Sequence, residues 1–269
     1  MKNLYVTTFN SKLYTQSGKD LLTSFLKYIE NGDMLVCYEG FDFKSDFESN
    51  DRIFDYNMEQ DEYMCNWITA NEDNIPEIYG GKAGDDHPIV KQFNDKEGQY
   101  WANHRASRYF RKVVALNYAL THYQNEYDYI FVIDCDCIFK NNIMDDKITD
   151  ELFIDDAAMI YFWSKHRKRI GRGPETGFTG YCKSNRGFEF AKKICDCYSS
   201  QDFLRFEFWD DGYVIGRLIN ENDQPNDQPF VLYDLVGQSK HRTTRVMEIP
   251  ENPLFGIVHH FKNRHQVSY

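Results

Sequence analysis

The chain has 269 residues and a formal net charge of −11, and 42% of its residues are hydrophobic and 16% aromatic. This length is enough for one large α/β domain with a sizeable core, or for two small domains. The acidic total argues against a general nucleic-acid coat but is compatible with a local basic patch. Seven cysteines without framework spacing indicate a reducing compartment and no disulfides. The sequence shows no signal peptide and no apolar stretch of membrane length, so we expect a cytoplasmic protein.

The first residues predict a βαβ unit. Residues 4–8 are an apolar run typical of a strand, residues 9–18 are polar like a loop, and residues 19–30 carry apolar side chains at helical spacing. Residues 34–38 follow as a second strand. This order is typical of a parallel sheet that holds a nucleotide at the carboxyl ends of its strands.

The rest of the chain continues the alternation of helices and strands. We expect short helices at 51–58 and 61–70, a polar loop at 82–98 and a long helix at 101–124. The segments that follow are strands at 129–133, 157–163, 178–181 and 230–235, helices at 187–198 and 207–220, and a basic, glycine-containing loop at 164–177. The sequence has no internal repeat or low-complexity linker, so the simplest organisation is a single α/β domain.

The most informative motif is Asp134-Cys135-Asp136, which directly follows the apolar run 129–133. Two carboxylates beside a buried strand are expected only where the chain leaves the sheet at its carboxyl end, the ligand-binding edge of open α/β sheets. Alternate residues of an extended segment point the same way, so both can face one metal ion. Hard oxygen ligands suit Mg²⁺ or Mn²⁺, which also hold substrate phosphates. The alternative is a helix cap or a solvated turn.

Two further groups of charged residues fit the same site. Arg108 and Lys112 lie four residues apart on the expected helix 101–124, which puts both on one helical face. We expect one of them to meet a phosphate; the alternative is a solvated basic face. Near the C-terminus, His259 or His260 can ligate Mn²⁺ and Lys262 can neutralise a leaving diphosphate. The alternative is a solvent-exposed histidine without a role in the site.

Three acidic residues are candidates for general acid–base work. Glu175 precedes Thr-Gly-Phe, and Asp210 and Asp211 follow Trp209. A carboxylate near the acceptor can take the proton from an attacking hydroxyl. We favour Asp211 over Asp210 as the base, and either one can instead cap the helix that follows.

Basic side chains are concentrated in two segments of this acidic chain. The first contains Lys165, His166, Arg167, Lys168, Arg169 and Arg172, and the second contains Lys240, His241, Arg242 and Arg245. Phosphate contacts dominate nucleic-acid affinity and use such side chains. The alternatives are contacts to the diphosphate of a sugar nucleotide only, or solvated loops.

Taken together, these motifs resemble glycosyltransferases of the GT-A fold, whose Asp-x-Asp binds the divalent ion that holds the nucleotide-sugar diphosphate. More narrowly, the chain is similar to a phage-rich branch related to the base J and TET/JBP-associated DNA glycosyltransferases. The matching pieces run in order along nearly the whole chain: residues 5–10, Arg108-Tyr109-x-x-Lys112, Ile133-Asp134-x-Asp136, Glu175-Thr176-Gly177-Phe178, Trp209-x-Asp211-x-Tyr213-Val214 and His260-Phe261-Lys262.

The resemblance implies a single GT-A-like domain over 1–269, with a mixed, mainly parallel sheet flanked by helices, a nucleotide-sugar-binding half (1–140) and an acceptor-binding half (141–269). The residues implied on the donor side are Thr7, Thr8, Asn10, Arg108, Lys112, Asp134 and Lys262. Those implied as metal ligands are Asp134, Asp136 and His260. Those implied on the acceptor side are Glu175, Asp210, Asp211, Trp209, Lys165, Arg167, Lys168, Arg169 and Arg172. The family pattern has a histidine at position 210, and Asp210 there leaves open which acidic residue is the base.

The resemblance also implies a substrate class. The donor is a UDP-sugar, a hexose or arabinose, used with Mn²⁺ or Mg²⁺. The acceptor implied is the hydroxymethyl group of 5-hydroxymethylcytosine in phage DNA, modified with inversion in the cytoplasm of an infected bacterium, with no membrane and no obligate protein partner. The rival acceptor is a surface or lipid-linked glycan. Two alternative functions lie outside the transferases. One is a haloacid-dehalogenase-like phosphatase, whose strand also ends in Asp-x-Asp, and the other is a non-catalytic module that binds a nucleotide or glycan.

Overall fold

A computed structural model provides the fold. It describes residues 1–47, 50–71, 106–141, 149, 152–169, 171–222, 229–237, 239, 250, 252–254 and 257–260. The expected loop 82–98, residues 101–105 of the expected long helix, Lys262 and the second basic segment (240–245) lie outside the described residues.

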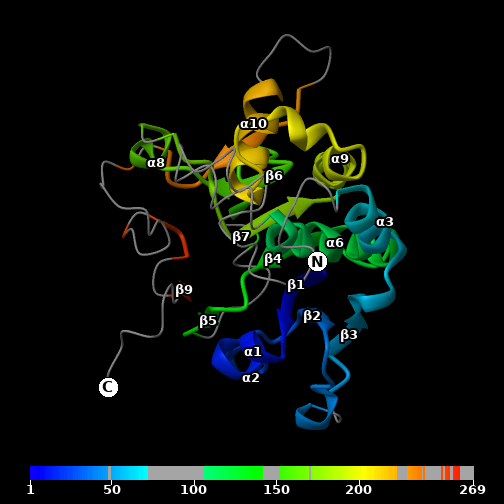
Figure 1. Cartoon of the computed structure of the whole chain (residues 1–269). Coiled ribbons are helices and arrows are strands. Elements are labelled where there is room, and N and C mark those ends of the chain that lie inside the picture. The colour runs from blue at the N-terminus through cyan, green and yellow to red at the C-terminus, as the bar shows by residue number, and fades with distance from the viewer. Residues whose placement is uncertain are drawn as a thin grey trace.

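A seven-stranded sheet forms the centre of the molecule (Figure 1). Its strands, in spatial order, are β3 (Ile53–Asn57), β2 (Asp33–Glu39), β1 (Asn3–Asn10), β4 (Tyr129–Ile133), β7 (Glu175–Cys182), β6 (Met159–Phe162) and β8 (Leu232–Asp234). Strands β1 to β4 pair in parallel, β7 is antiparallel to both of its neighbours, and β6 pairs in parallel with β8. The expected mixed, mainly parallel α/β sheet is therefore confirmed.

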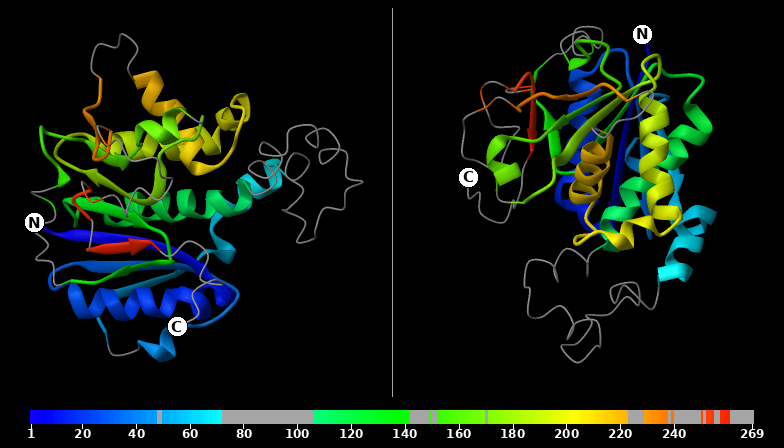
Figure 2. Two further views of the ribbon diagram at one scale, coloured as in Figure 1. Left: turned by 90° about the vertical axis from the view of Figure 1, so that its left-hand side faces the viewer. Right: turned by 90° about the horizontal axis from the view of Figure 1, so that it is seen from above.

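Helices cover both faces of this sheet (Figure 2). One face carries α3 (Glu62–Asn71), α6 (Ala106–Tyr123), α9 (Gly187–Ser199) and α10 (Asp211–Asn222), and their apolar residues pack with Leu4 and Val6 of β1. The other face carries α2 (Lys19–Tyr28) and a two-stranded sheet of β5 (Cys137–Phe139) and β9 (Val258–His260), which pack with Tyr5 and Phe9 of β1. The remaining short elements are α1 (Ser11–Leu13), η1 (Tyr14–Gly18), η2 (Lys44–Asp46), η3 (Met58–Gln60), α8 (Lys165–Arg169) and η5 (Asp202–Arg205).

The short helix expected at 51–58 is wrong, because most of this segment is the edge strand β3. Its register against β2 pairs Leu35 with Phe54. The ring of Phe54 stacks on Tyr123 at 5.7 Å, and Tyr56 stacks on Tyr118 at 3.5 Å. Aromatic packing against α6 thus stabilises the strand, and this tertiary contact overrides the local pattern.

Two segments expected to be loops contain helical turns. Residues 11–18 form α1 and the π-helical turn η1, which run directly into α2. Asn10 begins this turn, since its side chain accepts a hydrogen bond from the Leu13 N–H at 3.0 Å. The basic segment 164–177 likewise contains α8, and β7 begins earlier than expected, at Glu175.

All seven cysteines lie in the described part of the chain and are unpaired, and only Cys65 is exposed. Burial raises the pKa of the Cys135 thiol to about 12, as expected for a small apolar core residue. Within the described ranges, no helix combines the length and the apolar character needed to cross a bilayer.

Candidate active site

Lys112 joins two aspartates that are far apart in the sequence. Its Nζ lies 2.6 Å from Oδ1 of Asp134 and 2.7 Å from Oδ2 of Asp211. The same ammonium donates to the carbonyl and the hydroxyl of Thr176, both at 3.3 Å. Only 18% of the Lys112 side chain is exposed. Burial alone would lower the pKa of Lys112, but the two carboxylates raise it well above its usual value. This group of charges is called the Lys112 bridge below.

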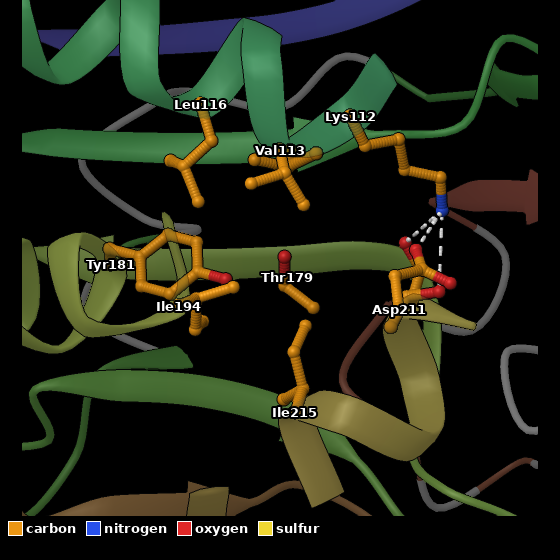
Figure 3. Close-up of a pocket in the computed structure, with 10 residues that line it drawn as sticks. Lys112, Val113, Leu116, Thr179, Tyr181, Ile194, Asp211 and Ile215 are labelled. Carbon is orange, nitrogen blue, oxygen red and sulfur yellow. Dashed lines mark hydrogen bonds and ion pairs between the residues drawn. The ribbon is translucent and has the colours of Figure 1, made fainter. Parts of the chain in front are cut away.

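Elements that are far apart in the sequence meet at the Lys112 bridge, and Figure 3 shows Lys112 and Asp211 facing each other across it. Lys112 comes from α6, Thr176 from β7 and Asp211 from the first turn of α10, and Asp134 directly follows β4. A cavity of about 20 Å³, roughly the size of one water molecule, lies beside the bridge. Its remaining lining residues include Thr179 and Tyr181 of β7 and Ile215 of α10. The bridge therefore closes the polar end of an otherwise largely apolar interface between helices and sheet.

Backbone contacts fix the two aspartates in place. The Asp134 N–H donates to the Gly177 carbonyl at 2.9 Å, and the Asp134 carbonyl accepts from the Cys137 N–H at 3.0 Å, which closes a tight turn after β4. On the other side, a side chain at Gly173 would overlap the carbonyl oxygen of Gly212. The start of α10 therefore depends on a glycine in the connection before β7.

Asp210 and Asp211 have different roles in α10. Oδ1 of Asp210 accepts a hydrogen bond from the Tyr213 N–H at 3.0 Å, which is the geometry of a helix N-cap. Burial, followed by the nearby charge of Asp211, raises the pKa of Asp210 to about 6. Asp211, 5% exposed, faces Lys112 instead. Of the two alternatives left open by the sequence, the structure makes Asp210 the cap.

A pocket of about 450 Å³ lies at the carboxyl ends of the parallel strands. It is lined by Thr8, Phe9, Asn10, Lys12, Leu13, Gln16, Glu39, Met58, Ser107, Arg108 and Arg111. The volume is in the range of small-molecule and cofactor sites. Three residues predicted on the donor side, Thr8, Asn10 and Arg108, therefore share this pocket. Thr7 is 1% exposed and is not among the residues that line the pocket.

Glu39 and Arg111 are pocket residues that the sequence reasoning missed. The Arg111 guanidinium contacts both oxygens of Glu39, with Nη2 to Oε1 at 3.1 Å, and Nη1 donates to the Ser107 carbonyl at 2.7 Å. Arg111 therefore has a fixed orientation, and Arg108, three residues earlier in α6, is exposed. Glu39 could have been found by the rule that singled out Asp134, because it too ends a buried parallel strand.

The carboxylates of the Asp134-x-Asp136 motif are compatible with a divalent ion. Both side chains are partly exposed at the end of β4, and they offer hard carboxylate oxygens. The pairing of β5 with β9 sets the backbone of His260 opposite Cys137, the residue after Asp136. Within the described residues, no three His, Cys, Asp or Glu side chains form a metal-binding group. Only the backbone of His260 belongs to the described part of the chain. The donor set fits a hard cation.

Glu175 and Arg167 are not exposed toward an acceptor. Arg167 Nη1 lies 2.9 Å from Oε2 of Glu175, and the guanidinium also donates to the carbonyls of Gly173 at 2.8 Å and Pro174 at 3.1 Å. Arg167 is 8% exposed and Glu175 is 4% exposed. The expectation that Arg167 meets a surface ligand is wrong. Its guanidinium instead binds Glu175 and two carbonyls of the connection between α8 and β7.

The other predicted acceptor residues divide into two groups. Trp209 is 9% exposed, and its indole N–H donates to the Phe206 carbonyl at 3.1 Å, so it packs in the core instead of forming an open platform. The side chains of Lys165, Lys168, Arg169 and Arg172 are exposed. Lys168 forms an ion pair with Asp234 at 3.0 Å.

Similar solved structures are glycosyltransferases. Mouse xyloside xylosyltransferase 1 in its apo form matches with a TM-score of 0.50 at 11% identity, over 87% of this chain and 85% of that one. The apo form of glycosyltransferase GlyE from Streptococcus pneumoniae TIGR4 matches with a TM-score of 0.48 at 12% identity, over 98% of this chain but only 55% of its own length. No protein-family model and no curated protein sequence matches the chain. The chain therefore has the GT-A-like fold of the xylosyltransferase, a mixed central sheet between layers of helices.

Proposed function

We propose that this protein transfers a sugar from a nucleotide-sugar donor to an acceptor hydroxyl, with a divalent ion. The observation that carries the proposal is the Lys112 bridge, which ties the carboxylate after β4 to a carboxylate at the start of α10. In an open α/β sheet, ligands bind at the carboxyl ends of parallel strands, and the pocket of about 450 Å³ lies there. The glycosyltransferase fold of the solved neighbour supports this reading by analogy of architecture.

The donor is assigned to this pocket. Its Arg108 is exposed at the first turn of α6, where a guanidinium can pair with a phosphate. Glu39 and the Ser107 carbonyl hold the guanidinium of Arg111, which lines the same pocket. A UDP-sugar fits the size and charge of this site.

Asp134 and Asp136, with His260, would hold the divalent ion. When bound, the ion supplies positive charge that offsets the charge developing on the leaving diphosphate. Lys112 has a related effect within the chain, because its ammonium lies within ion-pair distance of both Asp134 and Asp211 and offsets their negative charge. The same lysine fixes the orientation of the Asp211 carboxylate.

Asp211 is assigned as the general base that takes the proton from the acceptor hydroxyl. The hydroxyl oxygen then attacks the anomeric carbon opposite the bond to the leaving diphosphate, and the anomeric configuration is inverted. One observation favours Asp210 as an alternative base: its pKa of about 6 is closer to neutrality than that of an ordinary carboxyl. Its use as the helix cap favours the structural role.

The acceptor class we propose is a hydroxymethylated pyrimidine in DNA. The exposed cations of the acceptor half support it, since Lys165, Arg169 and Arg172 concentrate positive charge on a body of net charge −11. Arg167 is not one of these exposed cations, because it is paired with Glu175 inside the protein. A surface glycan is the alternative acceptor within the same reaction.

Isosteric carboxamides at the two aspartates test the base assignment. Asp211→Asn is expected to lower kcat at least a hundredfold, the usual size of a general-base contribution, and to leave donor binding measurable by calorimetry. Asp210→Asn preserves a capping side chain and is expected to lower kcat far less. Near-normal turnover of Asp211→Asn together with loss in Asp210→Asn would transfer the role to Asp210. Donor binding lost in both would point to misfolding of α10 instead.

A further inference from the structure

A second groove lies on the outward face of α10. Asp211 and Ile215 of this helix line the cavity beside Lys112. The groove, of about 200 Å³, is instead lined by the α10 residues Tyr213, Gly216, Arg217 and Asn220. These positions follow the i, i+3, i+4, i+7 spacing of one helical face. A ligand in the groove is therefore separated from Asp211 by the thickness of the helix and is not the reacting group.

Glycines form much of the surface of this groove. Gly171 and Gly173 come from the connection between α8 and β7, and Gly216 comes from α10. A Cβ at Gly216 would press on Pro174 at 3.0 Å and on the Trp163 ring at 3.3 Å. A Cβ at Gly171, where φ is +70°, would meet nothing within 4 Å. The glycine at 216 therefore lets α10 pack closely on Pro174 and Trp163, and the glycine at 171 leaves the space beside the groove backbone open.

Two aromatic side chains stand beside these glycines with fixed orientations. The Trp163 indole N–H donates to the Arg172 carbonyl at 2.7 Å, and its backbone N–H donates to Asp234 at 2.9 Å. The ring of Tyr213 packs edge-to-face on Phe208 at 5.0 Å. Both rings are half-buried. A ring held in this way loses little conformational entropy when a ligand stacks on it.

Cationic side chains line the same groove. Lys168 lies 5.0 Å from the centre of the Trp163 ring while it pairs with Asp234. Arg172 and Arg217 are exposed at the groove. Arginine suits phosphate oxygens because its planar fork can donate two parallel hydrogen bonds. The groove thus combines flat π surfaces with guanidinium groups, which is the chemistry of single-stranded nucleic-acid channels.

We infer that this groove binds a nucleotide of a single-stranded or locally opened strand, next to the nucleotide that accepts the sugar. Its base stacks against the ring of Trp163 with Tyr213 beside it, and its phosphate meets Arg172 and Arg217. A base inside a duplex cannot reach a carboxylate that is 5% exposed, so the reacting base must leave the stack. The adjacent nucleotide of the same DNA strand can then enter the groove. This inference rests on the proposed DNA acceptor, and an acidic glycan is the competing occupant.

Anisotropy of a labelled, unmodified single-stranded oligonucleotide tests the inference at several salt concentrations. Arg172→Ala/Arg217→Ala is expected to weaken binding about tenfold and to reduce the slope of log K against log[salt] by roughly 1.4, two phosphate contacts' worth. Trp163→Leu is expected to weaken binding about tenfold with the slope unchanged. Tyr213→Leu is the second aromatic variant if circular dichroism shows Trp163→Leu to be misfolded. Lys192→Ala, an exposed lysine of α9, is the matched control and should bind like wild type.

Three outcomes overturn the inference: no oligonucleotide binding by the wild type, binding that the groove variants leave intact, or an acidic oligosaccharide that competes for the groove where the oligonucleotide does not. Wild-type transfer to a free hydroxymethylated nucleoside needs no groove and tests the proposed function separately. If that transfer occurs but the arginine variant retains the wild-type KM for an oligonucleotide acceptor, the groove assignment fails and the proposed function stands.

Discussion

Removing the charge of Lys112 is the perturbation that most directly tests the bridge. Lys112→Met keeps the length and apolar stem of the side chain but leaves Asp134 and Asp211 without their shared cation. At an effective dielectric constant of about 20, each ion pair near 2.7 Å is worth about 6 kcal/mol before desolvation. Desolvation offsets much of this, and removing one partner of a buried pair costs about 3–5 kcal/mol. Since 18% of the Lys112 side chain is exposed, we expect a loss near 3 kcal/mol.

Urea unfolding measures this loss, with a matched control elsewhere in the chain. Lys192 forms an ion pair of the same length, 2.6 Å, with Asp196, but its side chain is 68% exposed. Lys192→Met is therefore expected to cost no more than about 0.5 kcal/mol. In Lys112→Met/Asp211→Asn one unpaired charge is absent, so part of the stability should return as a coupling energy in the double-mutant cycle. A Lys112→Met cost within error of the Lys192→Met cost would refute the bridge as a stabilising contact.

Three further predictions concern the cap, the glycine contact and the metal. Because the folded pKa of Asp210 is raised to about 6, the folded state binds the proton more tightly, and this carboxyl lowers stability as pH rises from about 4 to about 6. Between urea titrations at pH 4 and pH 7, the free energy of unfolding of Asp210→Asn should therefore rise by up to about 3 kcal/mol relative to that of wild type. A difference in unfolding free energy between the two proteins that is the same at both pH values would contradict this. Gly173→Ala should lower both the thermal midpoint and kcat, because its Cβ overlaps the start of α10, whereas Gly171→Ala should cost only the backbone strain of about 1 kcal/mol; equal effects would count against the contact. Asp136→Ala should abolish the Mn²⁺-dependent part of donor binding in calorimetry, and a metal response equal to wild type would remove Asp136 from the ion site.

The strands and the meeting of the site residues were largely predictable. Apolar runs such as 129–133 predict strands, and parallel strands bring their carboxyl ends to one edge. The residues after β4 and at the start of α10 were expected in one site, and the structure brings Lys112, Asp134 and Asp211 within ion-pair distance. Their roles in transfer remain part of the proposal.

Contacts between distant residues account for what the sequence reasoning missed. The strand β3 depends on stacking of Tyr56 on Tyr118, and no local pattern records that pair. Arg167 looks like a surface cation in the sequence because five basic residues surround it within 165–172. It is buried because Glu175 and two carbonyls happen to face it in the fold. Lys112 was expected to face the donor, and only the fold shows that Asp211 shares its charge.

Mass spectrometry of DNA nucleosides tests the proposed sugar transfer to DNA. Purified protein is incubated with Mn²⁺, a panel of UDP-sugars, and DNA with or without 5-hydroxymethylcytosine, and the digested nucleosides are analysed by mass spectrometry. Glycosyl transfer as proposed adds the mass of one pentose or hexose to the hydroxymethylated base alone, and this added mass is lost when EDTA is present. No added mass on any nucleoside and no release of nucleoside diphosphate from any donor would contradict glycosyl transfer itself. Metal-dependent release without added mass would retain the transferase and contradict the DNA acceptor.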